Sequence, residues 1–78
     1  MAVRLRVREL AEQQGLTLSL FQRRAQLPMS TARRFWYSTS DGSAQGEPLK
    51  QVNLEVLDEV ARFFGRAPGD LIERVEER

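Results

Sequence analysis

The chain has 78 residues, of which 41% are hydrophobic and 29% charged, and its net charge is +1. This length allows one small domain, residues 1–78, and the composition is that of a globular protein and not of a disordered one. Cysteine and histidine are both absent, which excludes a disulfide scaffold and a thiolate or imidazole metal site, so we expect no metal and no cofactor. Because no signal peptide or membrane-length apolar run is recognisable, we expect a cytoplasmic protein without membrane contact.

The charges divide the chain into halves of opposite sign. Residues 1–40 carry seven arginines against two glutamates, whereas residues 41–78 carry five bases against nine acids. Eleven of the twelve bases are arginine, whose planar fork suits phosphate oxygens and guanine edges. This asymmetry indicates one surface facing a polyanion and another facing away. On charge alone, scattered solvated charge that aids solubility remains the better explanation.

The first part of the chain predicts a short strand and then two short helices. Residues 2–7 alternate between apolar and basic side chains, which predicts a strand or an extended lead-in. From Val7 the apolar residues follow a helical period that Gly15 ends. Thr17 is a suitable N-cap for a second helix. Pro28 then predicts a break of three or four residues before the next helix.

A third helix is predicted from Pro28 or Met29 to Tyr37, and its two faces differ in chemistry. One face is apolar and consists of Ala32, Phe35 and Trp36. The other carries Met29, Ser30, Arg33, Arg34 and Tyr37. The segment that follows, loop 38–48, is rich in turn-forming residues and lacks any apolar periodicity.

The rest of the chain predicts two more short helices. Asn53 is placed to cap a fourth helix, which Gly65 ends. A fifth helix begins at Pro68 and has Leu71, Ile72 and Val75 as its apolar residues. The tail 73–78 is a candidate strand that pairs with segment 3–6. The predicted fold class is therefore all-α, a bundle of about five short helices that contains a helix-turn-helix, with a small two-stranded pairing of the chain ends as an optional addition.

The sequence thus predicts two short helices, a tight break and then a helix whose outer face carries arginines. This order matches a docking arrangement in which the helix after the break lies in the major groove. The residues that specify the arrangement further are Gly15-Leu16-Thr17, Phe21, Arg23-Arg24-Ala25, Leu27, Ser30-Thr31-Ala32, Arg34-Phe35, the run 52–58, Ala61, Phe64-Gly65 and Pro68-Gly69-Asp70-Leu71-Ile72. Together they resemble the phage-repressor class of helix-turn-helix proteins, often called the XRE family. The resemblance covers residues 5–75, apart from loop 38–48, which it identifies as an insertion.

The resemblance implies a sequence-specific transcriptional regulator, such as a repressor, that binds double-stranded DNA as a homodimer. It implies that Met29, Ser30, Arg33 and Tyr37 face base edges. It also implies that Arg23, Thr31, Arg34 and Ser38 lie near phosphates.

Three positions depart from the family pattern. Gln22 stands where a small residue is usual, and Gln26 stands where the turn usually has glycine. Leu18 replaces a glutamine that touches a phosphate in the family.

Several of these residues also have a purely structural interpretation. Arg23 fits solvated surface charge as well as a phosphate contact. Tyr37 fits a helix-capping role, and Met29 fits packing. Trp36, if half exposed, is a candidate interface residue, as is Phe63, although core packing explains both.

Two other classes of function are alternatives to DNA binding. A protein-interaction module, such as an antitoxin-like component with a protein partner, would keep the fold and lose DNA docking. An enzyme is not expected, since neither a nucleophile motif nor a phosphate-binding loop nor a set of metal carboxylates is recognisable in the sequence.

Overall fold

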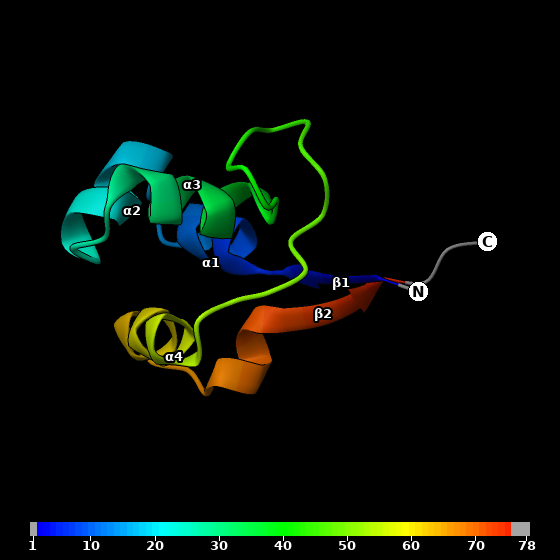
Figure 1. Cartoon of the computed structure of the whole chain (residues 1–78). Coiled ribbons are helices and arrows are strands. Elements are labelled where there is room, and N and C mark those ends of the chain that lie inside the picture. Colours follow the sequence, from blue (N-terminus) through cyan, green and yellow to red (C-terminus); the bar gives the residue numbers. More distant parts are fainter. Residues whose placement is uncertain (1, 76–78) are drawn as a thin grey trace.

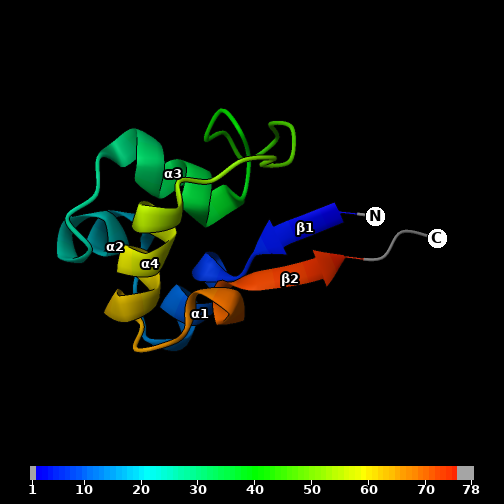
Figure 2. The same ribbon diagram turned by 60° about the horizontal axis from the view of Figure 1, so that its bottom comes forward.

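The computed structural model of the chain describes residues 2–75 (Figure 1). In chain order the elements are β1 (Ala2–Leu5), α1 (Val7–Gln13), α2 (Leu18–Arg24), α3 (Met29–Tyr37), α4 (Leu54–Phe63), a 3-10 helix (Pro68–Leu71) and β2 (Ile72–Val75). The α-helices gather on one side and the two strands extend away from them (Figure 1 and Figure 2). No helix within the described residues is long and apolar enough to cross a membrane.

The helix boundaries follow the capping chemistry of the sequence. Thr17 begins α2, and its hydroxyl oxygen accepts a backbone N–H of the first turn at 3.2 Å. Asn53 begins α4 in the same way, with its side-chain oxygen accepting a backbone N–H at 2.8 Å. Gly15 and Gly65 follow α1 and α4 with φ values of +73° and +68°, a region that glycine enters at little cost. The predicted caps and helix ends are confirmed.

The fold class departs from the prediction in two respects. The described residues form four α-helices and not about five, because the segment that starts at Pro68 makes a single 3-10 turn and ends at Leu71. Ile72 then adopts φ −112° and ψ 134°, which is extended geometry. Ile72 and Val75 therefore belong to β2 and not to a fifth helix. The domain is mainly helical with a small sheet, so the all-α assignment is incomplete.

The pairing of the two chain ends is confirmed. β1 and β2 are antiparallel, and their register places Arg4 opposite Glu73. The Arg4 guanidinium donates to the Glu73 carboxylate at 2.7 Å. β1 and β2 each begin one residue before the segments that were expected to pair, 3–6 and 73–78. Residues 76–78 of the expected strand lie outside the described residues.

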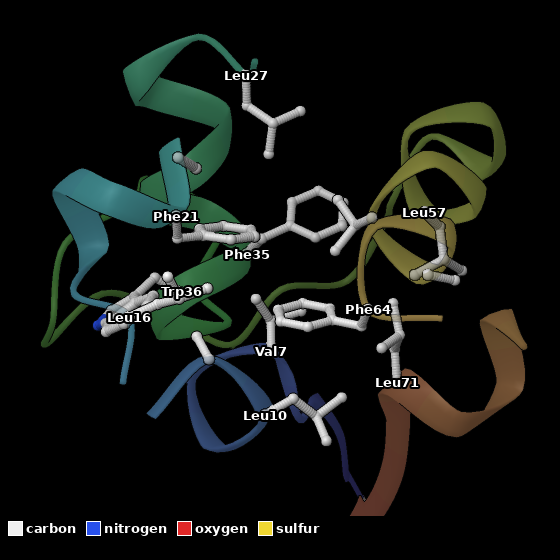
Figure 3. Packing of buried hydrophobic residues seen from close by; sticks show 14 residues of the cluster. Val7, Leu10, Leu16, Phe21, Leu27, Phe35, Trp36, Leu57, Phe64 and Leu71 are labelled. Atoms are coloured by element: carbon white, nitrogen blue, oxygen red, sulfur yellow. The ribbon is translucent and has the colours of Figure 1, made fainter. Parts of the chain in front are cut away.

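A cluster of buried hydrophobic side chains joins the helices and the 3-10 turn (Figure 3). Phe21 of α2 lies at its centre, fully buried. Its ring centroid is 6.0 Å from those of Trp36 and Phe63 and 5.9 Å from that of Phe64. Because α2, α3 and α4 each contribute an aromatic ring to this contact, Phe21 fixes the position of α3 relative to the rest of the fold.

We expect Phe21→Ala to lower the free energy of unfolding by about 3–5 kcal/mol, since it removes the ring at the centre of the core. A loss of this size approaches the whole stability of a small domain, about 5 kcal/mol. Circular dichroism during urea titration measures the effect. Leu54→Ala is the control, because Leu54 is 76% exposed and its truncation is expected to change little. Equal losses in the two variants would contradict this account of the core.

Candidate nucleic-acid interface

The turn between α2 and α3 is tight although it lacks the small residues of the family pattern. Gln26 lies in the left-handed region with φ +57°, which costs a non-glycine residue about 1 kcal/mol. The Gln22 side-chain amide donates to the Leu27 carbonyl at 2.7 Å. The Leu27 N–H donates in return to the Gln22 carbonyl at 3.1 Å. Gln22 therefore clamps the turn with its side chain, and this departure from the family pattern has a structural role.

Helix α3 separates its side chains into an inner and an outer face. Ala32, Phe35 and Trp36 are buried on the inner face. Arg33 and Arg34 are exposed on the outer one. Trp36 is only 8% exposed, which favours the core-packing interpretation over that of a half-exposed interface residue, and its burial leaves little of the ring for an interface. The reason is its position on the face that packs against Phe21.

The other predicted site residues lie in different environments. Met29, Ser30 and Arg23 are exposed, whereas Thr31, Tyr37 and Phe63 are half-buried. Leu18 is half-buried against the core. The Ser38 hydroxyl oxygen accepts the Leu5 N–H at 2.9 Å. Ser38 is therefore better explained as the link between α3 and β1 than as a phosphate contact.

The ion pairs leave the positive charge concentrated on α2 and α3. At the N-terminal end, three arginines pair with acids at 2.7 to 3.4 Å: Arg4 with Glu73, Arg6 with Glu9 and Arg8 with Glu12. Among residues 2–75, no ion pair involves the arginines of the two central helices, Arg23, Arg24, Arg33 and Arg34. The stretch 13–40, which contains both helices, has no acidic residue. A one-sign field of this kind attracts a polyanion.

The comparisons with known proteins agree with this geometry. A family model described as "Cro/C1-type HTH DNA-binding domain" matches residues 6–77. The chain belongs to the Cro/C1-type helix-turn-helix family. Searches of curated proteins and of solved structures found no match. DNA binding is therefore the general property of the family to which this domain belongs.

Loop 38–48 of this Cro/C1-type domain has hydrogen bonds of its own. The Thr39 side chain is buried, and its hydroxyl donates to the Ser43 carbonyl at 2.7 Å. The Asp41 carboxylate accepts from both the N–H and the hydroxyl of Ser43 at 3.0 Å. These bonds lower the pKa of Asp41, because they stabilise its charged form. Asp41 is therefore ionised at neutral pH.

The tip of the loop rests on α3. Gly42 is buried, and a Cβ placed on it would lie 3.2 Å from the Cβ of Arg33 and 3.6 Å from the backbone N of Arg34. Sequence reasoning missed this contact. The pair Asp41-Gly42 indicates a turn, but it carries no signal for the surface on which that turn rests.

We expect Gln22→Glu to lower the free energy of unfolding by about 1–2 kcal/mol. The substitution keeps the shape of the side chain, yet a carboxylate cannot donate to the Leu27 carbonyl. Urea unfolding measures the difference. Gln51→Glu makes the same change at an exposed position outside the helices, and it is expected to have little effect. A Gln22→Glu protein as stable as the Gln51→Glu protein would show that the clamp is unimportant.

Proposed function

We propose that this Cro/C1-type domain is a sequence-specific transcriptional regulator that places α3 in the major groove of duplex DNA. One observation carries the proposal. The inner face of α3 is buried, while Arg33 and Arg34 on the outer face are exposed and have no ion pair among residues 2–75. The major groove, about 12 Å wide, accepts a single helix with this division of faces.

The proposed contacts follow from position on α2 and α3. Met29, Ser30 and Arg33 face base edges, and Tyr37 borders them. Arg23, Thr31 and Arg34 lie nearer the phosphates. An arginine that bonds both acceptors of a guanine contributes roughly 1–3 kcal/mol of discrimination against other bases. Phosphate contacts position the protein and carry little sequence information.

We propose further that the protein acts as a homodimer, in the cytoplasm, and as a repressor. A nine-residue helix offers few base contacts, and a two-fold pair doubles them on half-sites about 34 Å apart. The whole chain would then be one DNA-binding domain, with loop 38–48 as an insertion. Phe63, half-buried beside Phe64, remains a candidate interface residue.

A protein-interaction module is the second candidate function. Leu18 offers no polar group where the family has a phosphate contact, and the acidic loop 38–48 lies against α3. A fold that had exchanged DNA for a protein partner would have both features. A partner that co-purifies in equal amount and leaves Arg33 and Arg34 accessible would favour this function over DNA binding.

Fluorescence anisotropy with a selected duplex and with random duplexes tests the leading proposal. We expect the association constant of the wild type to fall steeply with salt, because Lys and Arg contacts to phosphate release counterions. Arg33→Ala is expected to reduce the preference for the selected duplex by about 1–3 kcal/mol. Arg34→Ala should weaken binding to both duplexes alike.

The control is Arg62→Ala on α4, which removes the same charge from an exposed arginine paired with Asp58. It is expected to leave both affinities nearly unchanged. Binding that is absent at low salt, or that falls equally in the Arg33 and Arg62 variants, would overturn the proposal.

A further inference from the structure

The outer face of α3 is already covered in part by another segment of the same chain. A helix turns by about 100° per residue, so Arg33 and Arg34 flank the middle of the face opposite the buried Ala32 and Phe35. Gly42 lies against the stems of these two arginines. A Cβ placed on it would be 3.2 Å from the Cβ of Arg33 and 3.5 Å from the Cγ of Arg34. Figure 1 shows the loop leaving the end of α3 and folding back beside it.

Hydrogen bonds close the loop at its base, whereas its tip, residues 41–46, packs against α3. The Ser40 N–H donates to the Glu47 carbonyl at 2.9 Å, and Thr39 bridges to Pro48. Among residues 2–75, the hydrogen bonds and ion pairs include none between the tip, 41–46, and α3. The tip meets α3 through van der Waals contact, whereas inside the loop the Thr39 hydroxyl donates to the Ser43 carbonyl at 2.7 Å. Lifting the tip off α3 therefore breaks no polar interaction with the helix itself.

The loop and a duplex compete for the same space. An α-helix with its side chains is about 10–12 Å across, which already fills a groove about 12 Å wide. The loop tip lies against the stems of Arg33 and Arg34 and adds to that width, so this part of α3 cannot enter the groove fully while the tip stays in place. Residues 41–49 also carry Asp41 and Glu47 and no base, so the loop repels phosphates and is not suited to enter the groove with the helix.

We propose that loop 38–48 is an autoinhibitory lid, which lies over the stems of Arg33 and Arg34 on the outer face of α3 in the free protein and lifts off when a duplex binds. This inference rests on the proposed function, since it takes α3 as the helix that enters the groove. The apparent dissociation constant of a protein that binds only in its open form equals the intrinsic constant divided by the fraction of molecules that is open. A lid closed in about nine of ten molecules would therefore weaken binding about tenfold.

The first test compares two glycine substitutions by duplex titration. Gly42→Ala adds a Cβ that presses on Arg33 and Arg34, and we expect it to lift the lid and tighten duplex binding about fivefold or more. Gly65→Ala is the matched control. Gly42 and Gly65 both have a positive φ, but a Cβ added to Gly65 meets no atom within 4 Å. The duplex affinity of the Gly65→Ala protein should therefore equal that of the wild type. An unchanged or weaker affinity for Gly42→Ala overturns the lid.

A shortened loop tests the same idea without added strain. The N–H of Ser40 and the carbonyl of Glu47 already meet at 2.9 Å, so an Asn-Gly turn can replace residues 41–46 and close the hairpin. We expect this protein to bind duplexes about tenfold more tightly than the wild type. Weaker binding would instead make the loop a DNA contact and overturn the proposal.

A fluorescent label separates failure of the lid from failure of DNA binding. Ala44 and Trp36 line the same groove, and the chain has one tryptophan and no cysteine. A bimane label on Ala44→Cys should therefore be quenched by Trp36 while the loop is closed. We expect the emission of the labelled protein to rise when duplex is added. We expect the labelled protein that also carries Gly42→Ala to have the higher emission already without duplex. If no duplex binds, the proposed function fails, and the emission of the Gly42→Ala protein still decides: an increase supports the lid and no change overturns it.

Discussion

Burial of the inner face of α3 is the interaction on which the candidate interface depends. A helix of nine residues is too short to be stable in water by itself. Its stability comes from Phe35 and Trp36, which are buried in the core, and from the contact of Trp36 with Phe21. Because successive side chains of a helix project at fixed angles, burial of the inner face of α3 also fixes the direction in which Arg33 and Arg34 point. The core therefore provides both the helix and its orientation.

The parts of the fold that depend on local chemistry could be predicted from the sequence. Thr17 and Asn53 begin helices because their side-chain oxygens reach backbone N–H groups within the next turn. Pro28 ends the turn before α3 for an equally local reason, its fixed φ and missing N–H. The division of α3 into two faces followed from spacing alone. The structure therefore has the predicted helix, with Arg33 and Arg34 on its exposed face.

The parts that depend on distant contacts could not be predicted. Ile72 has helix-compatible spacing, but it pairs with β1, at the other end of the chain, and is extended. Gln22 departs from the family pattern in sequence, yet its bond to the Leu27 carbonyl restores a tight turn. The position of Gly42 on α3 depends on how a hairpin folds back, for which a single sequence has no periodic signal. The contact between the loop and α3 was therefore harder to predict than α3 itself.

Chemical modification of arginine measures the central claim most directly, since it asks which guanidinium groups a duplex covers. Phenylglyoxal labelling, mapped by mass spectrometry with and without a bound duplex, gives the reactivity of each arginine. The account predicts that the duplex protects Arg33 and Arg34 and leaves Arg62 and Arg66, which lie on and after α4, as reactive as in the free protein. Protection of Arg62 and Arg66 with Arg33 and Arg34 unchanged would contradict it.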